Sequence, residues 1–181
     1  MSIEEDEHRA LAALEPKFMT ALKAIEDNRV DTAEDLLKAI LIVEPRLPEP
    51  HMELARVYLA MERLEEAEEH ARMAVEMLEN TGPWLDGIED EVVASLGHAL
   101  LAEVLRRRLE EDDVIFGDPN EFRRLTRESQ EHFATAARLD PSDETSSYYA
   151  FFMGTPEEMN LPGASPIDVD DSEAADDDEA P

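Results

Sequence analysis

Apolar side chains recur every three or four residues along most of this 181-residue chain, which is the spacing of a helix with one buried face. Leu54, Tyr58, Ala67, Ala71 and Ala74 follow this rule. The pattern predicts an all-α fold. The expected helices cover about residues 15–28, 31–44, 49–61, 63–80 and 88–111, followed by one that begins at Pro119 and one over 142–154.

Residue types typical of helix ends set these limits. Asp31, with Glu34 three residues later, forms a capping-box pattern at the start of one helix. Asp118 before Pro119, with Glu121 completing the box, predicts the start of another. The helices are therefore expected to be separate rods joined by turns.

Small residues reveal an internal repeat. When the sequence is shifted by 34 residues, Ala21 falls on Ala55 and Ala33 falls on Ala67. Such residues let two antiparallel helices approach closely, whereas bulky side chains would push the pair apart. The expected units are 15–45, 48–82 and 88–141.

The third unit is longer than the other two. The interval from Gly97 to Pro141 is nearly twice as long as the matching interval of the first unit, from Ala21 to Pro45. The extra length predicts a lengthened first helix and an added loop around Ile115–Gly117.

These units resemble the tetratricopeptide repeat family over residues 15–141, about 70% of the chain. The residues that carry the resemblance are Ala21, Ala33, Leu37, Ile40 and Pro45; then Leu54, Ala55, Tyr58, Ala67, Ala71 and Ala74; then Leu96, Gly97, Leu100, Phe133, Ala136 and Pro141. The closing proline of the second unit is displaced to Pro83. The resemblance implies an α-α superhelix of about three helix pairs with a C-terminal capping helix.

Both ends of the chain differ from the repeats. Residues 1–14 are expected to hold a leading helix that bends or ends near Pro16. The helix over 142–154, capped by Ser142 or Asp143, either covers the apolar edge of the last repeat or offers its aromatic side chains as a contact surface. These aromatic residues are Tyr148, Tyr149, Phe151 and Phe152. Beyond them, a Pro-rich linker and an acidic tail over 155–181 are expected to be disordered.

Charge limits the classes of partner. The chain has 46 acidic and 16 basic residues, which give a net charge of −30. Such a protein is not a general binder of nucleic acid or anionic membranes, because phosphate binding needs a basic surface. The acidity reflects either a salty habitat or a GC-rich genome, or a preference for basic partners. Since MSIEEDE is unlike a signal peptide and no apolar stretch is long enough to span a membrane, we expect a cytoplasmic protein.

No motif points to catalysis. The five histidines lack HxxxH or HExxH spacing, and the chain has no cysteine, nucleophile elbow, Walker A loop or GxGxxG loop. Asp168–Asp171 mimics part of a calcium loop but lacks its glycine and its closing glutamate. We therefore expect no enzyme activity, no metal site and no cofactor.

The resemblance implies that partners bind on the concave face, which the first helix of each pair lines. The groove positions carried over are Phe18, Leu22, Ile25, Met52, Arg56, Leu59, Ala94, His98 and Leu101. This apolar strip suits an amphipathic helix or an extended apolar peptide. Alternatively, His98 is a structural histidine, and the protein's own terminal helix fills the groove.

A subset of the family grips a partner's carboxyl terminus with Lys, Asn and Arg. The corresponding positions here hold Phe18, Leu22, Glu53, Glu91 and Ser95. Since two of these side chains are apolar and two are acidic, the resemblance does not extend to carboxylate binding.

Six arginines gather near the end of one helix and the start of the next: Arg106, Arg107, Arg108, Arg123, Arg124 and Arg127. They either neutralise neighbouring acidic residues in surface pairs or form an anion site for an acidic partner segment or the protein's own tail. The sequence as a whole predicts a non-catalytic protein-binding module, an adaptor, scaffold or assembly chaperone. The alternative is an acidic electrostatic binder of basic proteins, acting as a nucleic-acid mimic or holdase.

Overall fold

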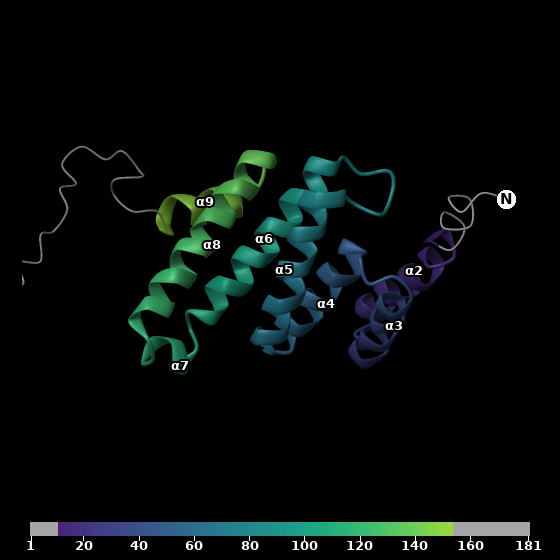
Figure 1. Ribbon diagram of the computed structural model, residues 1–181, viewed down its shortest axis with the longest axis horizontal. Coiled ribbons are helices and arrows are strands. Elements are labelled where there is room, and N and C mark those ends of the chain that lie inside the picture. The colour runs from purple at the N-terminus through teal and green to yellow at the C-terminus, as the bar shows by residue number, and fades with distance from the viewer. Residues whose placement is uncertain (1–10, 154–181) are drawn as a thin grey trace, which may run out of the picture.

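The computed structural model describes residues 11–153, which form helices and turns with no strand (Figure 1). The helices are α2 (Glu15–Glu26), α3 (Val30–Val43), α4 (Pro48–Ala60), α5 (Leu64–Thr81), α6 (Asp90–Arg108), α7 (Asp112–Ile115), α8 (Pro119–Leu139) and α9 (Glu144–Met153). The all-α prediction is confirmed. Most of the expected leading helix, and the tail over 155–181, lie outside the described residues.

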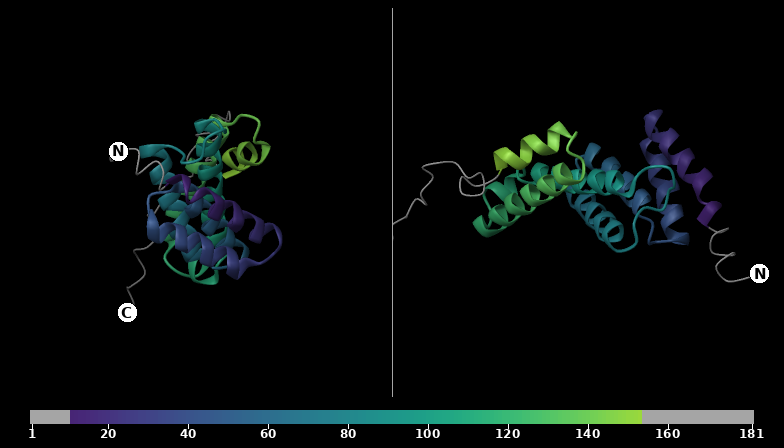
Figure 2. Two further views of the ribbon diagram at one scale, coloured as in Figure 1. Left: turned by 90° about the vertical axis from the view of Figure 1, so that its right-hand side faces the viewer. Right: turned by 90° about the horizontal axis from the view of Figure 1, so that it is seen from above.

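Three helix pairs are stacked side by side along the longest axis of the molecule (Figures 1 and 2). α2 packs on α3, α4 on α5, and α6 on α8, while α9 lies against α8 at the far end. This arrangement is the helical solenoid that the resemblance implied. Of the helices between residues 11 and 153, none combines the length and the apolar character needed to cross a bilayer.

In each of the first two pairs, the same type of turn joins the two helices. Asn28 and Glu62, which hold equivalent places in successive repeats, both have a positive φ, of 56° and 57°. The amide that follows each of them donates to a carbonyl five residues back, Arg29 N to Ala24 O at 2.7 Å and Arg63 N to Tyr58 O at 2.9 Å. The repeat is therefore present in the backbone conformation as well as in the sequence.

Small side chains lie where the helices touch. Ala21, Ala33, Ala55 and Ala67 are each 0% exposed. The four alanines hold equivalent places in two successive pairs, as the internal repeat predicts. A larger side chain at any of them would have to displace a neighbouring helix, because protein interiors are close-packed.

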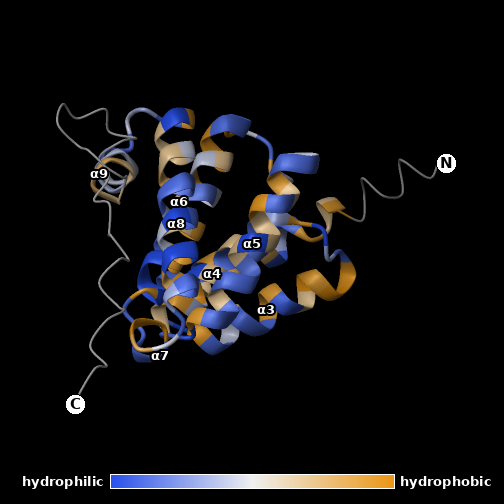
Figure 3. Ribbon diagram, turned by 60° about the vertical axis from the view of Figure 1, so that its left-hand side comes forward, coloured by the Kyte–Doolittle hydropathy of each residue, from blue (hydrophilic) through white to orange (hydrophobic). Residues whose placement is uncertain are grey.

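The third pair reaches the same architecture with longer rods. α6 has 19 residues and α8 has 21, compared with 13 for α4 and 18 for α5. The expected loop around Ile115–Gly117 is in part helical, because a single turn, α7, includes Ile115 and anchors Val114 in the core. Figure 3 shows both hydrophilic and hydrophobic residues at this turn, whereas the neighbouring α8 is mainly hydrophilic.

The helix starts agree only in part with the expected caps. Asp118 accepts a hydrogen bond from Asn120 N at 2.9 Å, and Asp143 accepts one from Thr145 N at 3.0 Å, so both of these caps are confirmed. The prediction that Asp31 is an N-cap is wrong, because the helix already begins at Val30. The turn described above sets that boundary, and no side-chain cap is needed.

Candidate functional site

The groove positions divide into two groups by burial. Five side chains on α2, α4 and α6 remain accessible to solvent, namely Leu22, Ile25, Arg56, Leu59 and Ala94. Four are buried in the structure: Phe18, Met52, His98 and Leu101. Leu22, Ile25 and Leu59 pack against the core with one side and keep the other exposed. The accessible part of the strip is therefore apolar, apart from Arg56.

His98 points into the interface between α6 and α8. It is 6% exposed, and its Nδ1 lies 2.9 Å from Nδ1 of His132 on α8, with the two rings stacked. One Nδ1 must donate and the other accept, so the two rings cannot both be doubly protonated. This geometry corresponds to the structural role that the sequence left open for His98.

A second histidine pair occupies the interface between α4 and α5. His51 Nδ1 lies 2.7 Å from His70 Nδ1, and His51 Nε2 lies 3.1 Å from the Pro45 carbonyl oxygen. Burial lowers the pKa of His51, His70 and His98, and burial together with the neighbouring His98 lowers the pKa of His132 to about 4. No sequence pattern indicated these pairs, since the partners of each pair are far apart in the chain and lie on different helices.

The arginines of the proposed anion patch contact several different neighbours. Arg106 donates to Glu103 and Glu110 and lies over the Tyr149 ring, 5.3 Å from its centroid. Arg107 donates to Glu62 at 2.7 Å, on the turn that joins α4 to α5. These contacts fit the alternative in which the arginines neutralise nearby acidic residues.

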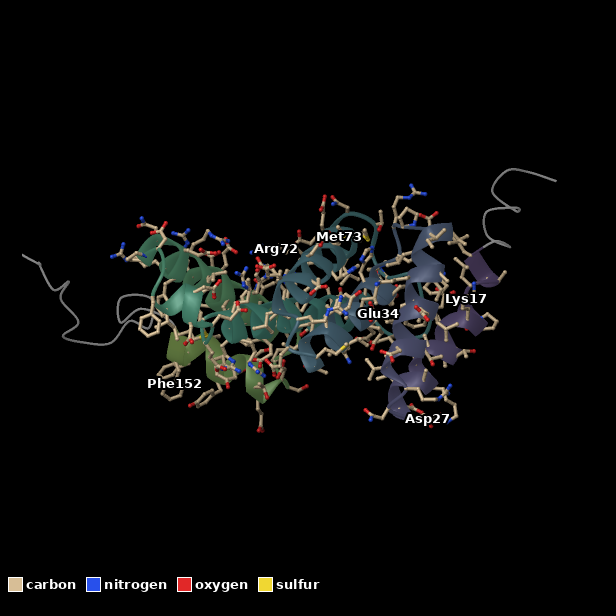
Figure 4. All side chains as sticks on the ribbon, turned by 90° about the horizontal axis from the view of Figure 1, so that it is seen from below. Lys17, Asp27, Glu34, Arg72, Met73 and Phe152 are labelled. Atoms are coloured by element: carbon tan, nitrogen blue, oxygen red, sulfur yellow. The ribbon has the colours of Figure 1, made fainter. Side chains whose placement is uncertain are left out.

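Arg108 belongs to a charge network that spans three helices. Its Nη1 donates to Glu68 on α5 at 2.5 Å, and Glu68 also accepts from Arg72. Arg72 on α5 in turn donates to Glu128 on α8 at 2.5 Å, and Figure 4 shows Arg72 near the middle of the molecule. Although burial opposes it, hydrogen bonds from Arg108 and Arg72 keep the pKa of Glu68 below its usual range.

The other three arginines of the patch lie along α8. Arg124 donates to Glu128 at 3.1 Å, and Arg127 lies 3.9 Å from Glu131. Arg123 donates to Asn120 at 3.2 Å, and no ion pair of Arg123 occurs within residues 11–153. A free anion would therefore compete with carboxylates that already hold most of these guanidinium groups.

A second network joins the first pair to the second. Tyr58 on α4 donates its hydroxyl hydrogen to Glu34 on α3 at 3.0 Å, and Arg63 lies 4.3 Å above the Tyr58 ring. Glu34 also accepts from Lys38, which holds the pKa of this carboxyl below its usual range. The network fixes how successive pairs are oriented, because its members come from α3, α4 and the turn before α5.

The described part of the chain contains no group of side chains suited to bind a metal ion. Between residues 11 and 153, no three His, Asp or Glu side chains are grouped so that they could hold a metal ion.

Glu53, at one of the positions that grip a carboxyl terminus in some relatives, is largely buried, and burial raises the pKa of its carboxyl.

Comparison with known proteins identifies the same repeat. Residues 24–81 match a family model described as tetratricopeptide repeat. The first TPR of Spaghetti (RPAP3), bound to the HSP90 peptide SRMEEVD, is similar with a TM-score of 0.58 and 11% identity, over 77% of this chain and 89% of that chain. The Arabidopsis OM64 TPR domain gives a TM-score of 0.55 and 14% identity, over 80% of this chain and 96% of that one. No curated protein matches the sequence.

Proposed function

We propose that this chain, which is a tetratricopeptide repeat protein, is a non-catalytic module that binds a helix or peptide of a partner protein along α2, α4 and α6. It would act as an adaptor, scaffold or assembly chaperone. The main support is the row of half-buried apolar side chains, Leu22, Ile25 and Leu59, on the first helices of two successive pairs.

The kind of partner follows from this row. Apolar side chains that are already fixed against the core lose little conformational freedom when they are covered, so they favour binding. A partner with apolar residues three or four apart on one helix face would cover them. Arg56, which lies 3.9 Å from Glu53 and whose side chain is 46% exposed, would favour an acidic residue at the edge of that face.

An acidic carboxyl-terminal peptide is a poor candidate for this groove. The RPAP3 domain holds an HSP90 peptide, but its likeness to this chain at 11% identity concerns the fold. The positions that would grip a carboxylate here include Leu22, Glu53 and Glu91, which offer no cation. Repulsion by the two acids would oppose such a ligand.

Two double variants test the groove. Leu22→Asp with Leu59→Asp places charge in the apolar row, whereas Ile42→Asp with Val43→Asp adds the same charge at exposed positions on α3. A partner captured with the wild-type protein and identified by mass spectrometry should bind the first variant about tenfold or more weakly, as measured by calorimetry. Equal loss with both variants, in chains that remain folded by circular dichroism, would refute groove binding.

A second candidate function rests on the net charge of −30. Most arginines of the patch on α6 and α8 are already held by carboxylates, so the free charge of the surface is mainly negative. Such a surface would attract basic proteins. Salt separates the two functions, because apolar burial survives about 0.5 M salt whereas attraction between exposed charges is screened within a few ångströms.

A further inference from the structure

The loop between α5 and α6 is fastened to the side of the molecule where α2 begins (Figure 1). Glu49 on α4 is 8% exposed, and its Oε1 accepts hydrogen bonds from Trp84 N at 2.8 Å and Leu85 N at 2.9 Å. The Trp84 ring meets the buried Phe18 ring of α2 edge to face, with centroids 5.6 Å apart. A buried carboxylate that accepts two amide hydrogens is a strong fastening, so the loop has a defined position.

The fastened loop, the residues just before α2 and the first residue of α2 line a cavity of about 370 Å³, which we call the loop pocket. It is lined by Leu11, Ala12, Glu15, Trp84, Leu85 and Asp86. Ala12, Glu15 and Asp86 are exposed, so the pocket is accessible from solvent. Its volume lies within the range of about 300–1,000 Å³ typical of pockets that hold small ligands.

The chemistry of the lining is apolar and acidic, with no basic side chain. Leu11, Trp84 and Leu85 provide apolar walls. Glu15 and Asp86 provide carboxylates, and neither forms an ion pair with any residue between 11 and 153. A ligand that suits these walls carries a positive charge next to apolar groups.

We propose that the loop pocket binds an arginine side chain of a basic peptide segment, with the guanidinium between Glu15 and Asp86 and over the Trp84 ring. Arginine fits better than lysine, because its planar guanidinium stacks on an aromatic face and donates two parallel hydrogen bonds to a carboxylate. An apolar neighbour of that arginine would contact Leu11 and Leu85.

The loop pocket is separate from the groove. None of its six lining residues is among the nine groove positions, although Trp84 contacts Phe18 behind the apolar row. A partner can therefore occupy the loop pocket or the groove alone. An experiment that refutes one of the two proposals does not refute the other. The chain's overall charge of −30 would attract basic peptides from a distance, but only the pocket would distinguish arginine from a neutral isostere.

Trp84 provides the measurement, since it is the only tryptophan of the chain. The full chain is titrated with the capped peptide Ac-LRLRL-amide while tryptophan emission is recorded. The same peptide with citrulline in place of arginine has the shape but not the charge. We expect saturable quenching or a spectral shift with the arginine peptide and at least about tenfold weaker binding of the citrulline peptide.

Two charge-matched variants identify the site. Glu15→Gln with Asp86→Asn should weaken binding of the arginine peptide by about tenfold or more, whereas Glu65→Gln with Glu76→Gln, at exposed positions of α5, should change it by less than about twofold. Equal weakening by both variants would show attraction by net charge alone and overturn the proposal. Equal binding of both peptides, or no saturable change in Trp84 emission, would overturn it as well.

Discussion

The α4/α5 pair and the α6/α8 pair share one architecture but hold it together by different means. Both bury a histidine pair with its Nδ1 atoms within 2.9 Å between their helices. Between α4 and α5, the close contacts are made by alanines such as Ala55 and Ala67, which are fully buried. Between α6 and α8, serine hydroxyls cross the interface in both directions, from Ser95 to the Ala136 carbonyl and from Ser129 to the Ala102 carbonyl.

This difference shows that the fold requires small volume at the contact, not a particular residue. Serine is only one oxygen larger than alanine, and its hydroxyl is satisfied by a helix carbonyl, so the longer rods of the third pair can also approach closely. Gly97, which aligns with the small position of the first helix, instead faces α5, where an added Cβ would lie 2.7 Å from Leu78 Cδ1. The third pair therefore has small residues at two interfaces, between α6 and α8 and between α6 and α5.

The largest effect is expected at the end of the longer pair. Phe133 is 1% exposed and stacks on Tyr149 of α9 with ring centroids 4.9 Å apart. Phe133→Ala should lower the free energy of unfolding by about 3–5 kcal/mol, because it leaves a cavity and removes the surface on which α9 packs. Urea unfolding measures this value. Phe116→Ala, at a position that is 83% exposed, is the control, and a similar loss there would contradict the prediction.

Overpacking the shorter pair should have the next largest effect. Ala67→Leu adds three carbon atoms at a contact that is 0% exposed, and we expect a loss of about 1–3 kcal/mol in the free energy of unfolding. Ala60→Leu, at an exposed position near the end of α4, makes the same change without a helix against it. If thermal melts showed the two variants to be equally stable, close contact through alanine would not be what holds α4 and α5 together.

The serine hydroxyls of the longer pair should contribute less. Ser129→Ala removes the 2.8 Å hydrogen bond to a backbone carbonyl, together with a 3.8 Å contact with Met153 Sδ, and should cost about 0.5–1.5 kcal/mol of unfolding free energy. The matching change at the exposed Ser147 should cost almost nothing. A loss above about 3 kcal/mol would mean that the hydroxyl does more than satisfy this carbonyl.

The sequence predicted the regular pairs better than the stretched one, for a physical reason. The repeat is visible in the first two pairs because Ala21, Ala33, Ala55 and Ala67 hold equivalent contacts in equivalent turns. In the third pair, Ser95, Ala102, Ser129 and Ala136 make the corresponding contacts, but α7 and the longer helices remove the constant spacing. The resemblance already included Ala136, whereas the roles of Ser95, Ala102 and Ser129 become visible only when α6 and α8 are placed side by side.

Long-range polar contacts were the other part that the sequence did not reveal. The bond from Trp84 N to Glu49 joins residues far apart in the chain, and its existence depends on the path of the loop rather than on helix periodicity. The same holds for the groove, where the resemblance to the repeat family selected Phe18, Met52, His98 and Leu101 together with the accessible residues. Periodicity tells which face of a helix carries apolar residues, but the packing of neighbouring helices decides which of them stay exposed.

Lowering the pH should destabilise the protein through both histidine pairs, but to a different extent for each pair. This effect should be smaller than those above. A histidine whose pKa is lowered in the folded chain binds fewer protons there than in the unfolded chain, so stability rises with pH across the window between the two pKa values. For His132 this window runs from about 4 to the ordinary value of 6.5, and stability should fall as the pH is lowered through it. The wild-type melting temperature at pH 5 should therefore be lower than at pH 7.

Matched variants assign this pH dependence. The charged groups that face the His98–His132 pair are Glu79, Arg138, Arg72 and Glu128, and those that face the His51–His70 pair are Glu69, Lys38 and Glu34. His132→Asn should reduce the fall in melting temperature between pH 7 and pH 5 more than His70→Asn, because His132 has its pKa lowered to about 4 by burial and by His98. Glu53, whose pKa is raised by burial, changes stability in the opposite direction but equally in all three proteins. Equal pH dependence of the wild type and the His132→Asn variant would show that the stacked pair takes up no proton on unfolding, and would contradict the prediction.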